Sequence, residues 1–322
     1  MTYNSIEDIP RIGFGLWKIP RNLCSDLVYK AIKSGYRHFD SASDYGNERE
    51  VGEGIKNAID DGLCEREDLW LTSKLWNTYH HPSHAKLALE KTLYDLQLDY
   101  LDLYLIHFPI SLKFVPFEER YPPEWFYDPN TPEPAMAPAR VPLSDTWQAM
   151  EGLKREKLAR HIGICNYSSA LLHDLMNYCE TKPEVLQIEA HPYHTQEKLI
   201  RLAKNYEMEV TAFSPLGSLS YEEMGGAEHS ESLLFNETIQ KIAGSLQATP
   251  AQVVLGWALS RGTSVVVKSS SNRRMLENLN SATLKLDQAA MDAISQLNRN
   301  KRYNDPGVFC EDAFNTFYPI YE

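Results

Sequence analysis

Short apolar runs alternate along this chain with longer stretches in which apolar residues recur every three or four positions. The short runs are rich in β-branched and aromatic residues and have the length of buried strands. We therefore predict eight β-strands, over residues 12–17, 38–41, 69–74, 100–107, 161–165, 185–189, 209–213 and 264–268.

The longer stretches have the spacing of amphipathic helices. We predict helices over residues 48–59, 83–96, 145–157, 169–178 and 197–206, and over 236–243 joined to 250–260. Ser144 and Asp145 form a start signal for one helix, and Thr249 followed by Pro250 forms one for another.

Alternating strands and helices predict a parallel sheet that is covered by helices. A doubly wound sheet and a closed barrel both fit this pattern. Eight units with no change of composition between the two halves of the 322-residue chain favour the barrel. We therefore expect an α/β fold, a (β/α)8 TIM barrel, with residues 1–322 in one domain.

Residues 108–143 interrupt this alternation. The segment has no helical or strand period and holds nine of the eighteen prolines. It is also rich in aromatic residues, which argues against disorder. Because it follows the fourth strand, where barrel enzymes carry their chemistry, we expect a long loop on the substrate side. The alternative is a structural loop without ligand contact. We expect a second loop or tail over residues 300–322.

The composition restricts the classes of partner that the protein is expected to bind. The net charge is −12, and no basic stripe offsets it, so nucleic acid and membrane surfaces are not expected partners. The five cysteines are scattered, as is typical of reduced thiols in a cytoplasmic protein. The N-terminal segment has no apolar signal region, and no run is long enough to span a membrane.

Polar residues gather where the predicted strands end. In a parallel barrel these ends share one face, so the residues are expected to converge there. They are Asp40 with nearby Tyr45, Lys74, His107, Cys165, Asn166, Gln187, Ser214, Lys268 and Ser269.

Four of these residues suit carbonyl reduction. We expect the Lys74 ammonium to lower the pKa of Tyr45 and so to make its phenol a proton donor, while Asp40 holds the ammonium in place. His107 is expected to orient the carbonyl group by a hydrogen bond. A bound cofactor must supply the hydride. The alternative is a buried ion pair, a rim tyrosine and a core histidine that have only structural roles.

The residues after the eighth strand suit a phosphate group. Lys268 and Arg274 flank a serine-rich segment that opens a helix, and helix N-termini attract anions. The alternative is a capped and solvated helix start.

Other motifs fail. Gly13-Phe14-Gly15 begins like a dinucleotide fingerprint, but Lys18 stands where its third glycine belongs. His80, His81 and His84 are close in sequence but lack a carboxylate or cysteine partner, so we expect no metal site.

Several sequence blocks, in order, resemble the aldo-keto reductase superfamily over nearly the whole chain. These blocks are Gly35 to Asp40, Asp44 to Glu48, Leu71 to Trp76, Leu101 to His107 and Gln187 to Tyr193. The resemblance implies an NAD(P)H-dependent oxidoreductase in which Tyr45 is the general acid, Lys74 and Asp40 tune it, and His107 orients the carbonyl.

The resemblance also implies a set of cofactor contacts. It assigns Asn166 and Gln187, with Cys165 beside them, to the carboxamide, and Phe213, with Ser214 and Leu216 after it, to the nicotinamide side. Lys268, Ser269, Ser270, Ser271 and Arg274 match the region that binds the 2′-phosphate, and Glu277 and Asn278 match the adenine contacts. This set favours NADPH.

Three details are most similar to the xylose (aldose) reductases, namely Asp44, the loop from Phe114 to Pro123 and the segment from Arg302 to Pro306. By this likeness Trp17, Asp44 and Asn304, together with His107, contact the substrate.

The sequence departs from the pattern at Cys165, where serine is usual, at Ser270, where asparagine is frequent, and at Val267, where proline is usual. Glu223 is close to a position where a glutamate binds the ribose of NADH. Use of NADH beside NADPH therefore stays open.

We conclude from the sequence that the chain reduces an aldehyde or an open-chain, xylose-like aldose to its alcohol, as a monomer or a homodimer. Three alternatives stay open: reduction of an aldose 6-phosphate, with Lys113, Arg120 and Arg140 near the phosphate; a Schiff-base lyase that uses Lys74 or Lys268; and a non-catalytic NADPH-binding subunit.

Overall fold

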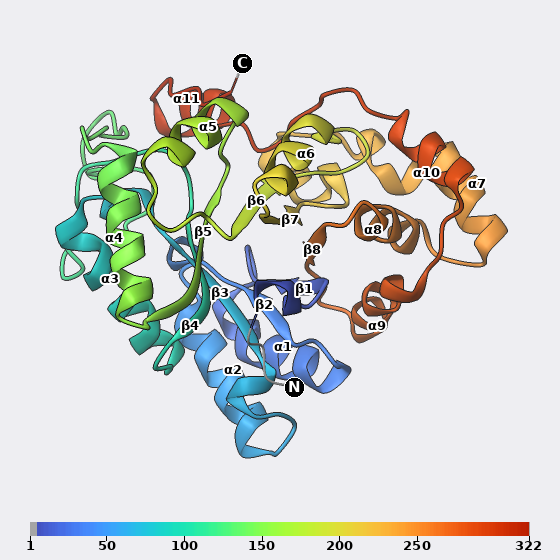
Figure 1. The fold of residues 1–322 in the computed structure, drawn as a ribbon, viewed down its shortest axis with the longest axis horizontal. Helices are drawn as coiled ribbons and strands as arrows, with labels where there is room; N and C mark the ends of the chain where they lie inside the picture. The colour runs from blue at the N-terminus through green and yellow to red at the C-terminus, as the bar shows by residue number, and fades with distance from the viewer. Residues whose placement is uncertain (1–4, 322) are drawn as a thin grey trace.

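The fold is a closed barrel of eight parallel strands in which each strand is hydrogen-bonded to its neighbours in sequence and β8 closes on β1. The computed structural model describes residues 5–321 (Figure 1). The strands are β1 Ile12–Gly15, β2 His38–Asp40, β3 Trp70–Leu75, β4 Leu101–Ile106, β5 Ala159–Cys165, β6 Val185–Glu189, β7 Glu209–Phe213 and β8 Ser264–Val267. The predicted barrel is confirmed, and strand boundaries differ from the predicted ones by at most two residues.

Alternating residues of one strand face two apolar regions. In β4, Leu103 and Leu105 belong to a small cluster with Trp70 and Cys165, whereas Leu101, Tyr104 and Ile106 belong to the large cluster. This alternation follows from the two-residue period of a strand. Lys74 pairs in register with Leu105, so its side chain is on the same face as the small cluster, inside the barrel.

Helices surround the barrel (Figure 1). They are α1 Arg21–Ser34, α2 Glu48–Asp60, α3 Pro82–Leu96, α4 Leu143–Arg155, α5 Ser169–Tyr178, α6 Glu197–Asn205, α7 Glu237–Leu246, α8 Pro250–Ser260, α9 Asn272–Asn280, α10 Gln288–Ser295 and α11 Pro306–Phe314. Short 3-10 helices lie at Ile6–Asp8, Ser43–Tyr45, Arg66–Asp68, Asn77–Tyr79, Gly217–Ser220, Glu222–Met224, His229–Glu231, Leu233–Phe235 and Ser281–Thr283.

Two helix predictions need correction, and two helices were not predicted. The segment predicted as a joined helix is two helices, because Gln247 has a left-handed backbone that ends α7, while a capping box of Thr249 and Gln252 starts α8. Ser144 and Asp145 do not cap α4, which begins one residue earlier with Pro142 at the cap position. The sequence reasoning also missed α1 and α10.

The tail over 300–322 is not only a loop. It contains α11, which Asp305 caps by accepting a hydrogen bond from the Gly307 amide at 2.8 Å. The long loop has no helix over residues 108–142 and one isolated bridge, between Leu112 and Pro138, while Leu143, the last residue of the predicted loop, begins α4.

The long loop and the tail pack on each other. The ring of Trp125 stacks on Phe314 with 5.5 Å between centroids. The side chain of Thr316 accepts a hydrogen bond from the Met136 amide at 3.0 Å, and Asn315 donates one to the Pro134 carbonyl at 2.8 Å. Two segments that are about 180 residues apart in sequence therefore form one cover at the end where β4 finishes.

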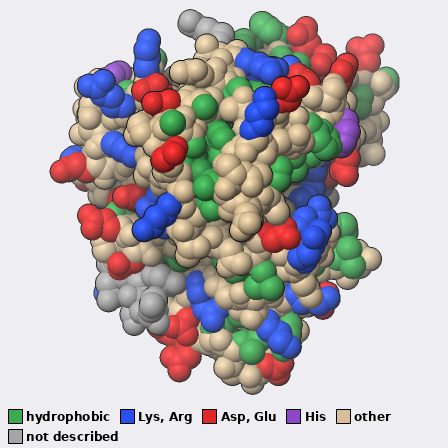
Figure 2. Space-filling model, turned by 90° about the vertical axis from the view of Figure 1, so that its right-hand side faces the viewer, with side chains coloured by type: hydrophobic (Ala, Val, Ile, Leu, Met, Phe, Trp, Pro, Cys, Tyr) green, Lys and Arg blue, Asp and Glu red, His purple; other side chains and the backbone are tan. Residues whose placement is uncertain are grey.

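No helix within residues 5–321 is long and apolar enough to cross a membrane. Figure 2 shows Lys and Arg side chains interspersed with Asp and Glu over the face that carries α7 to α10, and the described part of that face has no continuous basic stripe.

Candidate active site

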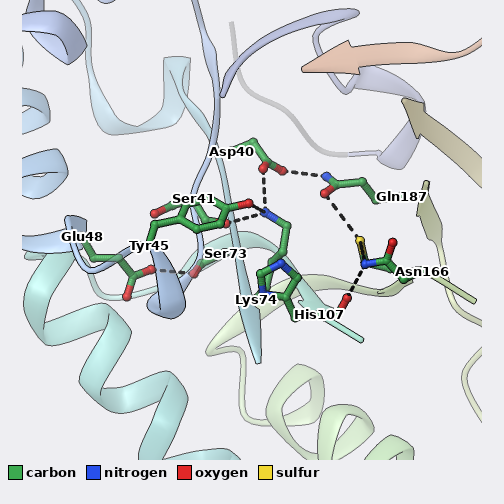
Figure 3. A network of polar contacts seen from close by, with 10 residues as sticks. Asp40, Ser41, Tyr45, Glu48, Ser73, Lys74, His107, Asn166 and Gln187 are labelled. Atoms are coloured by element: carbon green, nitrogen blue, oxygen red, sulfur yellow. Dashed lines mark hydrogen bonds and ion pairs between the residues drawn. The ribbon is translucent and has the colours of Figure 1, made fainter. Parts of the chain in front are cut away.

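The ammonium of Lys74 is at the centre of a buried polar network (Figure 3). Its Nζ atom lies 2.6 Å from Oδ1 of Asp40, 2.7 Å from the Ser41 carbonyl and 3.1 Å from the Tyr45 hydroxyl. Lys74 is 1 % exposed and Asp40 3 % exposed. Three residues that are predicted to act together therefore do converge, from β3, from the end of β2 and from the short helix Ser43–Tyr45.

The turn after β2 positions Tyr45. The helix Ser43–Tyr45 ends at Gly46, whose φ of 66° favours glycine. The Ser43 hydroxyl donates to the Lys74 carbonyl at 3.3 Å, and Arg21 donates to the Gly46 carbonyl at 2.6 Å. The turn that carries Tyr45 is thus bound to β3 on one side and to α1 on the other.

The electrostatics of Tyr45 differ from our expectation. Burial raises the pKa of Tyr45 above its ordinary value, and the attraction of Lys74 offsets only part of this effect. Burial by itself lowers the pKa of Lys74, but Asp40 and Tyr45 outweigh burial and raise it. Lys74 thus acts in the predicted direction, but the net pKa of Tyr45 is raised and not lowered, because the cost of placing a phenolate in a desolvated site exceeds the gain from one ammonium.

His107 follows β4 and is held between aromatic rings. It stacks on Phe108 at 4.9 Å and meets Trp76 and Tyr45 edge-on at 5.3 and 5.9 Å. Burial, together with Lys74 and His80, holds the pKa of His107 well below its ordinary value. The imidazole is therefore neutral at neutral pH.

Asn166 and Gln187 extend the network. The Asn166 amide donates to the His107 carbonyl at 2.9 Å and to Sγ of Cys165 at 3.2 Å. The Gln187 amide donates to Oδ2 of Asp40 at 2.6 Å. The two residues that we assigned to a carboxamide are thus tied to His107 and Asp40.

The end of β7 contributes Phe213, which packs on the small inner cluster and is partly exposed. Ser214 and Leu216 follow it and are also partly exposed. The hydroxyls of Ser214 and Tyr221 are 2.9 Å apart, and Tyr221 lies 5.7 Å from the ring of Trp17. Tyr221 thereby links the end of β7 to the segment after β1.

The predicted substrate residues are on two sides of this network. Asn304 donates to the Tyr221 hydroxyl at 3.4 Å, and the ring of Tyr221 in turn lies 5.7 Å from that of Trp17. Asp44 precedes Tyr45 in the same short helix. Burial, reinforced by Glu124 of the long loop, raises the pKa of Asp44 to about 7.

The serine-rich segment opens α9 as predicted. Ser271 caps the helix by accepting from the Arg274 amide at 3.5 Å, and Ser269 accepts from the Ser271 amide at 3.1 Å. Lys268, Ser270 and Arg274 are exposed.

Of the expected adenine contacts, Glu277 pairs with Arg273 at 3.7 Å and Asn278 is buried. Glu223, the expected ribose contact, is exposed in the short helix Glu222–Met224.

The sequence also matches known proteins. The Aldo/keto reductase family matches residues 11–299. This chain belongs to the aldo/keto reductase family. The resemblance drawn from the sequence blocks is therefore confirmed, and the protein is an oxidoreductase.

Individual proteins that are similar to this chain are also reductases. It is 45 % identical to an NAD(P)H-dependent D-xylose reductase from Kluyveromyces lactis and 45 % identical to an NADPH-dependent aldose reductase from Saccharomyces cerevisiae, with 98 % of both chains covered in each comparison. Its fold is similar to the solved structure of the aldose reductase from Schistosoma japonicum, with a TM-score of 0.85 and 35 % identity over 98 % of this chain and 96 % of that one.

The reductase has contacts that sequence reasoning missed. The hydroxyl of Tyr321 donates to the Asn166 carbonyl at 3.1 Å and lies 3.3 Å from its Oδ1, while Arg302 lies over its ring at 3.5 Å. Tyr221 and Glu189 also bind site residues. Glu189 lies in one of the motif blocks, but nothing local indicated which segment it would bind.

The histidines of the loop after β3 are dispersed. His80 is buried beside Ser111 at 3.1 Å, His81 contacts Ser83 at 2.7 Å, and His84 stacks on Phe114. No group of side chains within residues 5–321 has the composition of a metal site.

Proposed function

We propose that this reductase uses a reduced nicotinamide cofactor, NADPH and also NADH, to convert an aldehyde or open-chain aldose to its alcohol, with Tyr45 as general acid. The observation that carries the proposal is the 3.1 Å separation between the Tyr45 hydroxyl and the Lys74 ammonium at the end of the barrel where β3 finishes. The printed names of the relatives, which include D-xylose and NAD(P)H, support the cofactor and the substrate class.

The residues after β8 fit the cofactor. Exposed Lys268 and Arg274 flank the capped N-terminus of α9, which is a favourable place for a phosphate. Partly exposed Phe213 offers a ring face, and Asn166 and Gln187 offer amides. These residues would hold the dinucleotide across the end of the barrel. When bound, the reduced nicotinamide would supply a hydride to the carbonyl carbon.

Tyr45 then transfers its proton to the carbonyl oxygen. Because burial raises its pKa, the phenol is protonated throughout the neutral range and ready to donate. The negative charge that develops on its oxygen is stabilised by the Lys74 ammonium, whose own charge Asp40 secures. Neutral His107 can donate a hydrogen bond to the same carbonyl oxygen and so fix its direction.

The alternatives are less well supported. A Schiff base on Lys74 needs a neutral amine, whereas Asp40 and Tyr45 keep this lysine charged. Lys268 is separate from the network of Asp40, Tyr45 and Lys74, and we place it at the phosphate site. Of the three loop cations that could meet an aldose phosphate, Arg120 instead donates to the carbonyls of Pro123, Phe126 and Tyr127, whereas Lys113 and Arg140 are exposed.

Replacing Tyr45 by Phe tests the proposal. Turnover of xylose should fall by roughly 10² to 10⁴, the usual contribution of a general acid, while the Kd for NADPH measured by fluorescence stays within about threefold. Tyr127→Phe in the exposed part of the long loop is the matched control and should leave both values unchanged. Full activity of the Tyr45→Phe variant would reject the scheme.

A further inference from the structure

The carboxylate of Glu189 is the most deeply buried acid at the functional end of the barrel. It is the last residue of β6 and is 0 % exposed. Its Oε1 accepts from the Tyr303 amide at 2.8 Å and from Nε2 of His191 at 2.9 Å, and its Oε2 accepts from the Asn304 amide at 2.8 Å. Two of its three partners are thus consecutive backbone amides of one segment in the C-terminal tail.

Glu189 is charged in this environment. Burial by itself raises its pKa, but the hydrogen bonds from His191 and from the two amides outweigh burial and hold the pKa of Glu189 below its ordinary value. A buried carboxylate of this kind binds two neighbouring N–H groups more firmly than a neutral side chain would. The effect is to fix the backbone of Tyr303 and Asn304 against the end of β6.

The side chain of Asn304 is oriented by a second set of contacts, at its terminal amide. Its amide donates to the Tyr221 hydroxyl, which in turn is 2.9 Å from the Ser214 hydroxyl after β7. Its Oδ1 is buried and has no hydrogen-bond partner within residues 5–321. A buried acceptor without a partner is costly, so this oxygen is suited to a donor that arrives with a ligand, such as a hydroxyl group.

Strand β6 ties this arrangement to the catalytic network. Gln187, two residues before Glu189, donates to Asp40, the partner of Lys74. Residues two apart in a strand are on the same face. One strand therefore sets the positions of both Asp40 and Asn304.

We propose that Glu189 is a positioning residue for substrate specificity, which holds Asn304 so that its Oδ1 accepts a hydrogen bond from a hydroxyl group of the aldose. This inference rests on the proposed function. It adds a reason for preferring hydroxylated aldehydes over plain ones: an aldehyde without a hydroxyl leaves the buried acceptor unpaired.

The test compares Glu189→Gln with the wild type on xylose and on butanal, an aldehyde without hydroxyl groups. A glutamine offers one acceptor oxygen where two amides need one each, so the segment should shift. We expect kcat/KM for xylose to fall about tenfold or more, mainly through KM, and kcat/KM for butanal to change less than about twofold. Amide hydrogen exchange at residues 303 and 304 should become faster.

Asn304→Ala supplies the second arm. It should cause the same selective loss, and the double variant should be no worse than Asn304→Ala alone, because both changes remove one interaction. The matched control is Glu184→Gln, which removes a carboxylate just before β6 that binds His161 and does not contact residues 302–304. It should keep the ratio of the two substrates.

An equal loss for xylose and butanal, or additive losses in the double variant, would overturn the inference and leave Glu189 with a purely structural role. A wild type that reduces neither aldehyde would instead reject the proposed function, and the exchange rates at 303 and 304 would still report whether Glu189 holds the segment.

Discussion

The hydroxyl of Tyr321, one residue before the end of the chain, donates a hydrogen bond to the backbone carbonyl of Asn166 after β5. It also lies 3.3 Å from Oδ1 of Asn166. Asn166 is the residue that we assign to the cofactor carboxamide, so the tail reaches the same polar groups that the cofactor would use.

Tyr321→Phe is therefore expected to bind NADPH more tightly. The variant keeps the ring under Arg302 but loses the hydroxyl that occupies Asn166. Removing a hydrogen bond of about 1 kcal/mol that competes with the cofactor corresponds to roughly a fivefold lower Kd, measurable by fluorescence titration. Tyr318→Phe, in the same tail, is the control. Weaker binding by Tyr321→Phe would mean that the hydroxyl prepares Asn166 for the cofactor.

Lys74→Met should destabilise the protein strongly. The change leaves Asp40 as a buried carboxylate without its cation, which typically costs about 3–5 kcal/mol. Adding Asp40→Asn should recover a large part of this loss. Urea unfolding of the single and double variants measures both effects. Lys56→Met, which breaks an exposed pair with Asp60, should cost about 0.5 kcal/mol or less. A Lys74→Met variant as stable as that control would contradict the interpretation of a tightly coupled pair.

The stability of the protein should depend on pH through Glu48. The Glu48 carboxyl accepts hydrogen bonds from Ser73 at 2.6 Å and from Thr92 at 3.0 Å. Burial raises its pKa from 4.5 to about 7 despite these bonds. A raised folded pKa contributes stability that is complete below pH 4.5 and is lost as the pH rises through 7.

Glu48→Gln stays neutral and should not lose this contribution. The free energy of unfolding of the wild type should therefore fall relative to that of the variant by about 3 kcal/mol between these two pH values. Urea unfolding of both proteins at several pH values gives the difference. Two curves that stay parallel from pH 4.5 to 8 would show that Glu48 does not titrate in this range.

Arg274→Ala should weaken the binding of NADPH but not the binding of NADH. The Arg274 side chain is exposed beside the capped start of α9, where we place the 2′-phosphate. The Kd for NADPH should rise about tenfold, the effect of losing one charged phosphate contact, and the Kd for NADH should not change. Arg155→Ala, which removes an exposed arginine at the end of α4, is the control. Equal weakening of both cofactors would remove Arg274 from the phosphate site.

The sequence by itself determined the order and type of the elements that form the barrel. Apolar runs of strand length that alternate with amphipathic stretches are local patterns, and a parallel sheet brings the ends of its strands to one face. This is why the sequence alone places Asp40, Lys74 and His107 together. The same local patterns did not indicate α1. They also did not show that α7 and α8 are separate helices, which a left-handed residue divides.

Only the tertiary structure decided what surrounds these groups. The pKa of Tyr45 depends on how completely its neighbours exclude water, and a sequence pattern does not measure this exclusion. Glu189 meets Asn304 across 115 positions of the chain, and Tyr321 meets Asn166 across 155. Contacts at such separations depend on barrel closure and on how the tail folds over it, which no periodicity within a window of the sequence records.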